Sequence, residues 1–187
     1  MALVVGGTTV TGTQVLDATK LSGNLPALNG SSLTNLTAGK VLQVQSANFT
    51  SSSAHNTQTF SASNFTDQIT PSATNSKILV QFQFRSHIYQ GGDTESQSLL
   101  GIFRSINGAS YTQLYPNSDS ASWGMSVSDG ERGFWCTPQI NYLDTTHNTT
   151  SAIDYKIYGR RRLSSSGSVN IGGSSHQAQV VLMEIAA

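Results

Sequence analysis

The 187-residue chain carries ten basic and ten acidic side chains, so its formal net charge is zero. Only 11% of its residues are charged, and Ser, Thr, Asn, Gln and Gly together make up nearly half of it. A neutral chain has no basic field for nucleic acid and lacks the high net charge typical of disordered proteins. It also has too few Glu and Lys for a helical bundle. The composition favours a β-rich protein kept in solution by hydroxyl and amide groups.

Residues 1–39 differ from the rest of the chain. They contain no aromatic residue, and their leucines are separated by small polar residues at spacings that fit neither a helix nor a strand. Such a segment cannot bury its leucines alone, so we expect identical copies or a partner's groove to bury them. The alternative is a disordered linker. The expected stem or anchor residues are Leu16, Leu21, Leu25, Leu28, Leu33 and Leu36.

From residue 40 onward the pattern changes to strands and turns, which predicts a separate β-domain over residues 40–187. Ile78, Val80, Phe82, Phe84 and Ile88 alternate with polar residues, which predicts one long strand over residues 78–88 with one buried face. Asn107-Gly108 predicts a hairpin. No segment has a capped helical stripe. The further expected strands are 41–49, 58–69 (broken), 99–106, 111–115, 133–143, 153–163, 168–171 and 177–185. The number of strands predicts an all-β fold, an antiparallel β-sandwich or jelly roll.

Two of the expected strands are apolar on both faces. A monomeric sandwich should show polar residues on its outer faces, so we expect another subunit to cover these strands. The alternative is a central strand beneath a long loop. The residues expected at this subunit interface are Trp135, Leu143, Val181, Met183 and Ile185.

The sequence contains no convincing catalytic constellation. It lacks a Gly-x-Ser-x-Gly elbow and a phosphate-binding loop. Its four histidines are isolated, which argues against a metal site, and the single cysteine, Cys136, reads as a buried inert thiol. We therefore expect no catalytic, cofactor-binding or metal-binding residue. A glycan-degrading enzyme would require two facing carboxylates about 5–10 Å apart.

Aromatic and arginine side chains supply candidates for binding a host-surface glycan at distal loops. Arg160-Arg161-Arg162 is the only run of charge and could hold an anionic sugar or a neighbouring carboxylate; the alternative is a solvated strand end. The candidate glycan-binding residues are Tyr89, Tyr115, Trp123, Tyr158, Arg160 and Arg162.

No secretory signal and no apolar run long enough for a membrane span are visible. We therefore expect synthesis in a host cytoplasm, without membrane insertion.

Several segments resemble proteins of bacteriophage virion appendages, especially those of marine phages. Residues 16–36 (LDATKLSGNLPALNGSSLTNL) are similar to repeated units near the attachment ends of tail fibres. Residues 68–80 (QITPSATNSKILV) and the ending 180–185 (VVLMEI) are similar to pieces of their C-terminal β-domains. The chain is shorter than a long tail fibre, which suits a small head fibre or decoration protein as well as a tail tip.

The resemblance implies a non-enzymatic virion protein, usually trimeric, on the surface of the phage particle. Residues 1–39 would anchor it to other virion proteins of the capsid or tail, and residues 40–187 would form a trimeric head of the C1q/tumour-necrosis-factor kind. It supplies no catalytic residues and no cofactor. The alternative function is a secreted bacterial adhesin or carbohydrate-binding module.

Overall fold

The computed structural model describes residues 3–5, 8–10, 40–90, 96–115, 122–125, 132–161, 168–172 and 178–187. The chain divides into two compact units, Met1–Thr37 and Ala38–Ala187. In the first unit, strands β1 (Leu3–Val5) and β2 (Thr8–Val10) pair as a short antiparallel hairpin that the sequence analysis did not predict. The expected anchor leucines between residues 16 and 36 lie outside the described residues, so the anchor stays a prediction.

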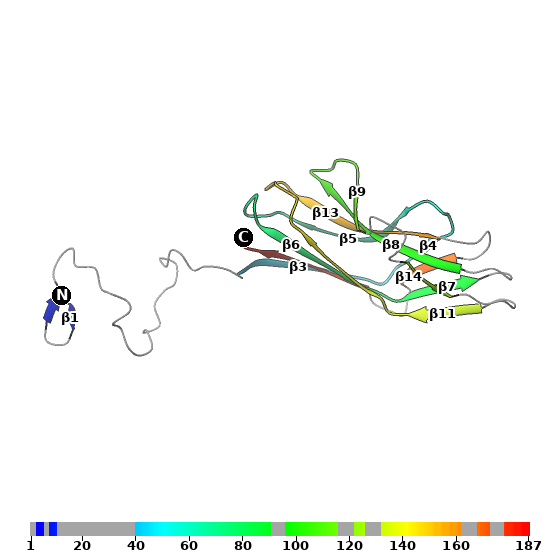
Figure 1. The fold of residues 1–187 in the computed structure, drawn as a ribbon, viewed down its shortest axis with the longest axis horizontal. Helices are drawn as coiled ribbons and strands as arrows, with labels where there is room; N and C mark the ends of the chain where they lie inside the picture. The colour runs from blue at the N-terminus through cyan, green and yellow to red at the C-terminus, as the bar shows by residue number, and fades with distance from the viewer. Residues whose placement is uncertain are drawn as a thin grey trace. The chain divides into compact units, whose positions relative to one another are not determined.

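The second unit is an all-β sandwich of antiparallel strands, as predicted, and the described residues contain no helix. One layer consists of two four-stranded sheets that lie end to end, because each strand of one sheet is the direct neighbour along the chain of a strand of the other (Figure 1). Its strands are β3 (Val41–Phe49), β4 (Ser52–His55), β6 (Lys77–Gln83), β7 (Ser86–Gln90), β11 (Arg132–Cys136), β12 (Gln139–Asp144), β14 (Ser168–Gly172) and β15 (Ala178–Ile185).

The orders of these two sheets are β3-β15-β6-β12 and β4-β14-β7-β11. We refer to them together as the first layer. The second layer has the order β5-β13-β8-β10, with β9 paired to β8. This interleaved order is that of a jelly roll with two Greek keys. The second-layer strands are β5 (Ser61–Ile69), β8 (Ser96–Ile106), β9 (Thr112–Tyr115), β10 (Ser122–Met125) and β13 (Ile153–Arg161).

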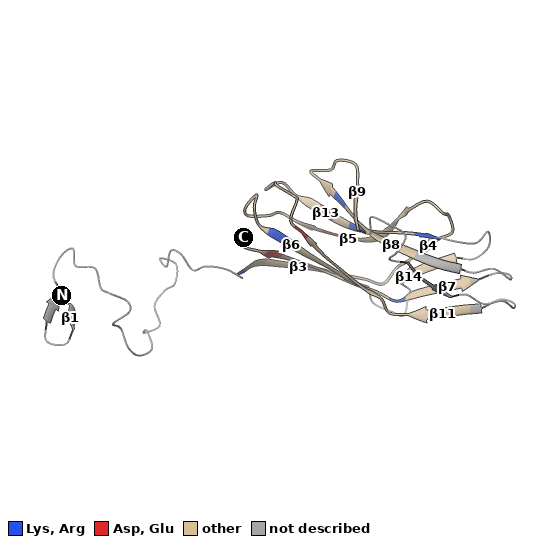
Figure 2. Ribbon diagram, in the orientation of Figure 1, with Lys and Arg blue, Asp and Glu red and all other residues tan. Residues whose placement is uncertain are grey.

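The apolar core lies between the two layers. Ile78, Val80 and Phe82 of β6 face inward and are buried, whereas the residues between them face outward, as their alternation predicted. The same alternation buries Ile153, Tyr155 and Ile157 of β13. Figure 2 shows how few charged residues the strands of the first layer carry. Buried aliphatic and aromatic side chains make up the core between the layers, and their burial favours folding.

The hairpin predicted at Asn107-Gly108 is confirmed. Both residues have positive φ, 51° and 74°, as a type I′ turn requires, and the turn joins β8 to β9. Two other expected strands are interrupted. The segment 78–88 breaks at Phe84-Arg85. The segment 133–143 breaks at Thr137-Pro138, where proline has a fixed φ and no backbone N–H to donate.

No helix in the described part of the chain is long and apolar enough to cross a membrane.

Candidate interaction surface

The outer face of the first layer carries a row of apolar side chains, one from each of four adjacent strands. Val44 of β3 lies opposite Met183 of β15, which lies opposite Leu79 of β6, which lies opposite Leu143 of β12. Ile185 and the first two residues of β3 extend the row. Together these residues form what we call the apolar patch: Val41, Leu42, Val44, Leu79, Leu143, Met183 and Ile185.

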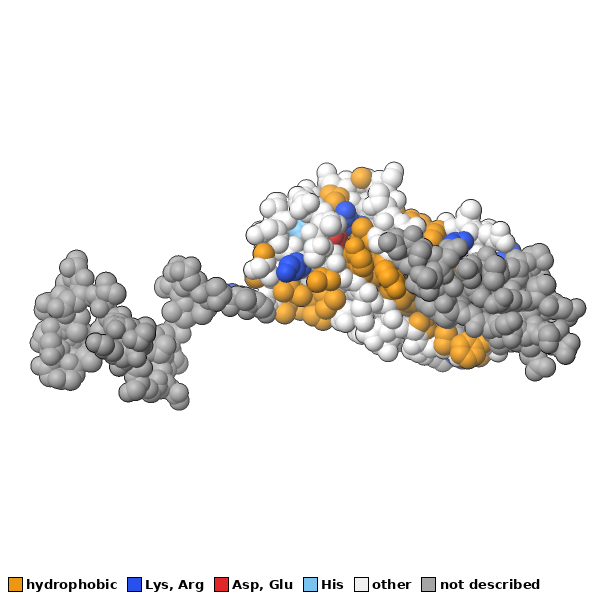
Figure 3. All heavy atoms as spheres, in the orientation of Figure 1, with side chains coloured by type: hydrophobic (Ala, Val, Ile, Leu, Met, Phe, Trp, Pro, Cys, Tyr) orange, Lys and Arg blue, Asp and Glu red, His pale blue; other side chains and the backbone are white. Residues whose placement is uncertain are grey.

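The apolar patch is unusually open for side chains of this kind. Val44 is 54% exposed and Leu143 is 44% exposed. Figure 3 shows apolar side chains gathered over the end of the domain where β3 begins, with a further apolar band crossing the same face. Contiguous exposed apolar surface in a sheet is typical of a protein contact. The patch therefore suits association with another protein surface.

All five residues expected at a subunit interface lie on this outer face. Leu143, Met183 and Ile185 are part of the apolar patch, and Val181 lies in the next row, between Ser46 and Gln81. Trp135 lies on the adjoining sheet, in β11. The sequence analysis missed Leu79, which occupies an outward position of β6, and the three apolar residues that open β3.

Trp135 has both faces of its indole ring covered. The guanidinium of Arg85 lies 3.7 Å from the ring centroid, and the imidazole of His87 is stacked 3.9 Å from it. The Arg85 guanidinium and the His87 ring cannot both fit over one face of the indole at these distances, so they lie on opposite faces. Burial and the positive charge of Arg85 lower the pKa of His87, so the imidazole is neutral near pH 7. Although Trp135 is 51% exposed, it presents its edge to solvent.

The candidate glycan residues whose side chains the structure describes lie on strands of both layers, and their role in binding a glycan stays a prediction. Tyr89 lies in β7 of the first layer, and Tyr115 lies in β9, with its ring centroid 6.3 Å from that of Tyr142. Tyr158 and Arg160 lie on β13 of the second layer. The Trp123 side chain and Arg162 are outside the described residues.

Tyr158 belongs to a half-buried aromatic cluster. Its ring stacks on Phe103 at 4.0 Å and lies 5.8 Å from Tyr111. Arg160 donates a hydrogen bond to the Gln58 carbonyl at 3.1 Å. Phe103 thus covers one face of the Tyr158 ring, and Tyr111, which directly precedes β9, packs close to the same ring.

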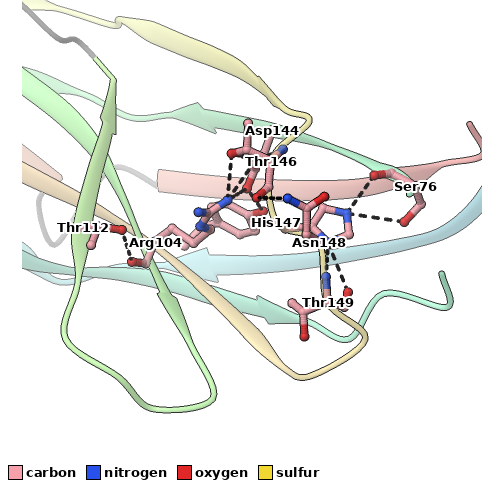
Figure 4. Close-up of polar contacts among 9 residues, drawn as sticks. Ser76, Arg104, Thr112, Asp144, Thr146, His147, Asn148 and Thr149 are labelled. Atoms are coloured by element: carbon pink, nitrogen blue, oxygen red, sulfur yellow. Dashed lines mark hydrogen bonds and ion pairs between the residues drawn. The ribbon is translucent and has the colours of Figure 1, made fainter. Parts of the chain in front are cut away.

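Two buried carboxylates test whether the fold holds an enzyme-like acid pair. Asp144 and Glu184 lie in one inward-facing row, separated by Ile78 of β6. Each is already satisfied by donors. Asp144 pairs with Arg104 at 2.7 Å and accepts the Tyr155 hydroxyl at 2.7 Å (Figure 4 shows the Arg104 contact). Such carboxylates stabilise the fold and present no oxygen to a substrate.

Glu184 is fully buried, and it makes no ion pair with any residue that the structure describes. It accepts hydrogen bonds from Gln43 Nε2 at 2.7 Å and from the Ser72 backbone N–H and hydroxyl at 2.8 and 2.9 Å. Burial alone would raise its pKa, but these donors outweigh it and lower the pKa from 4.5 to about 2. The hydrogen bonds of the fold therefore stabilise the ionised form of Glu184.

Glu184 is expected to make the protein acid-sensitive. Because its pKa is lower in the folded chain, its contribution of about 3 kcal/mol is present above pH 4.5 and is lost as the pH falls toward 2. Glu184→Gln should lose that part of the pH dependence. It should also be less stable near neutral pH, because the new amide N–H₂ group would face the hydrogen-bond donors of Gln43 or Ser72 in place of an acceptor oxygen. Urea denaturation across the pH range measures both effects.

A second buried group, His55, also makes the stability of the fold depend on pH, and its effect must be distinguished from that of Glu184. His55 is buried, and burial lowers its pKa from 6.5 to about 4. Because the unfolded chain binds this proton more readily than the folded chain, the fold loses stability as the pH falls from 6.5 toward 4, a range that lies above that of Glu184. An unchanged pH profile of Glu184→Gln below pH 4 would contradict the assignment to Glu184.

No three His, Cys, Asp or Glu side chains gather into a possible metal site within the described ranges.

No family model and no curated protein matches the sequence. Among solved structures, that of infectious bursal disease virus Gx strain is 15% identical with a TM-score of 0.32, over 87% of this chain and 41% of that one. The VP2 subviral particle of the same virus is 12% identical with a TM-score of 0.36, over 87% of this chain and 44% of that one. The chain thus spans less than half of their length, and its jelly-roll assignment rests on its own strand order.

Proposed function

We propose that the chain is a non-enzymatic structural protein of a virus particle, a fibre or decoration appendage of a phage. Its β-domain assembles with two further copies of itself through the apolar patch, and residues 1–39 attach it to other virion proteins. The open apolar row across four strands carries this proposal, because such a face gains free energy when a second surface covers it. The similarity of residues 16–36 to phage appendage segments supports the virion location.

A structural role also fits the buried polar groups. Asp144 and Glu184 are committed to internal hydrogen bonds, and the neutral composition suits repeated contact between identical surfaces. The protein would be made in the host cytoplasm and displayed on the particle surface. The tyrosine and arginine candidates for a host glycan remain predictions.

Charge placed in the apolar patch is expected to prevent assembly. Val44→Glu combined with Leu143→Glu changes two residues that are already open to solvent, so the fold should persist, but burying the new charges between copies is costly. Light scattering should give three times the 19.9 kDa chain mass for the unaltered protein and a single chain mass for the variant. The variant should also be missing from purified particles.

The matched control adds the same charge elsewhere. Ser110→Glu with Thr150→Glu alters two exposed residues outside the apolar patch and should leave the mass unchanged. An unaltered protein that is monomeric at high concentration would overturn the assembly proposal. Its absence from particles that form normally would overturn the virion proposal.

A further inference from the structure

A row of exposed amide side chains crosses the same outer face, two rows from the apolar patch. Asn48 of β3 lies opposite Gln179 of β15, which lies opposite Gln83 of β6, which lies opposite Gln139 of β12. Three of these amides, with Thr137, line an open hollow of about 260 Å³. The hollow lies where β11 gives way to β12, so the interruption of that strand helps to shape it.

The amides of this row are not used to hold the fold together. Within the described part of the chain, neither they nor Thr137 make a side-chain hydrogen bond, whereas Gln81 and Asn141 of the neighbouring row pair at 3.3 Å. Each amide offers two N–H donors and one acceptor oxygen. The hollow therefore presents uncommitted donors and acceptors side by side on adjacent strands.

Trp135 lies close to the hollow in the chain, because Thr137, which lines the hollow, follows it by two residues. The Trp135 ring lies between Arg85 and His87, which restricts its rotation. Trp135 is not part of the lining, but an indole held in this way can report on binding at Thr137.

We propose that this hollow binds one ring of a neutral, polyhydroxylated ligand, a hexose or N-acetylhexosamine unit of a glycan. Neighbouring hydroxyls of a sugar each donate and accept a hydrogen bond, which matches amides spaced by the strand separation of about 4.8 Å. Among the residues that the structure describes, the lining of the hollow carries no charge. Its volume lies below the range of about 300–1,000 Å³ of drug-sized pockets, which suits a single sugar ring.

This inference does not rest on the proposed assembly. The apolar patch and the amide row occupy different ends of the same strands, so sugar binding and oligomeric state can be measured separately. It also differs from the tyrosine and arginine candidates, because it uses amides that the sequence pattern did not single out.

The experiment is a screen of the full chain against immobilised neutral hexose and N-acetylhexosamine oligosaccharides, with a uronic-acid oligosaccharide alongside. We expect a neutral oligosaccharide to bind and its affinity to change little with salt. Binding should alter the fluorescence of Trp135 in a Trp123→Phe background, since the chain has two tryptophans. Gln83→Ala with Gln179→Ala should weaken that binding about tenfold or more.

The control is Gln45→Ala, which removes an exposed amide of β3 that does not line the hollow. It should bind as the unaltered chain does, and thermal unfolding should show all variants folded. The proposal is overturned if no neutral oligosaccharide binds, if only the acidic probe binds, or if the double variant binds as well as the control. It is equally overturned if the double variant changes the chain's mass and leaves sugar binding intact.

Discussion

Asp144→Asn is expected to destabilise the protein by about 3–5 kcal/mol, the usual cost of removing one partner of a buried ion pair. The Asp144 carboxylate is fully buried at the end of β12 and takes hydrogen bonds from three residues. Arg104 Nη1 lies 2.9 and 2.7 Å from its two oxygens, the Tyr155 hydroxyl lies 2.7 Å from Oδ2, and Thr146 donates its backbone N–H and its hydroxyl to Oδ1 (Figure 4 shows Arg104 and Thr146).

An asparagine cannot satisfy the same donors. It retains one acceptor oxygen, places an N–H₂ group against the remaining donors, and leaves Arg104 without its carboxylate. In the native chain, burial tends to raise the pKa of Asp144, but the hydrogen bonds from Tyr155, Thr146 and Arg104 and the charge of Arg104 lower it overall. The hydrogen bonds and the charge of Arg104 therefore stabilise the ionised form of the carboxylate.

Urea denaturation near neutral pH measures the loss. Tyr155→Phe serves as the graded control, because it removes a single hydrogen bond and should cost about 1–3 kcal/mol. A loss below that of Tyr155→Phe for Asp144→Asn would show that the cluster does not depend on the carboxylate's charge.

Gly172→Ala is expected to cost about 3 kcal/mol or more. Gly172 ends β14 with φ at 78°, in the left-handed region that side chains avoid at a cost of about 1–2 kcal/mol. A Cβ there would also overlap the Ser51 carbonyl oxygen and come within 2.5 Å of Phe65 Cζ. Neither neighbour can move easily, because Phe65 is core and Ser51 directly precedes β4, so overpacking adds a further ~1–3 kcal/mol.

Gly108→Ala separates the two causes. Gly108 has nearly the same φ, 74°, but open space surrounds its Cα. Gly108→Ala should lose only the stability that the left-handed φ costs a residue with a side chain, about 1–2 kcal/mol. Thermal and urea unfolding of the pair measure the difference. Equal losses for Gly172→Ala and Gly108→Ala would contradict the overlap at Gly172.

The sequence predicted the strands and their inward faces where alternation is regular, as in Ile78–Phe82 and Ile153–Ile157. It did not predict the interruption at Phe84-Arg85, because the apolar alternation runs through it from Val80 to Ile88 without a change of phase. The four-residue strands β4 and β10 were missed because they are too short to show a period.

The interaction surface was predictable only in part. Leu143 and Met183 were visible because their strands are apolar on both faces. The complete row also required Val44 and Leu79, whose alignment depends on the register of four strands far apart in the sequence. The Arg104–Asp144–Tyr155 cluster could not be predicted for the same reason, because no local sequence pattern links Arg104 to Asp144, 40 positions away.

The near absence of charge along the first layer has a kinetic consequence for the proposed assembly. Without complementary fields, two copies feel no attraction before they touch, so their encounter rate should fall near the unsteered range of about 10⁵–10⁶ M⁻¹s⁻¹. Added salt would then barely slow the reaction. The timing of assembly would depend on how many chains are present at once, which makes the level of synthesis, rather than the ionic conditions of the cell, the variable that controls it.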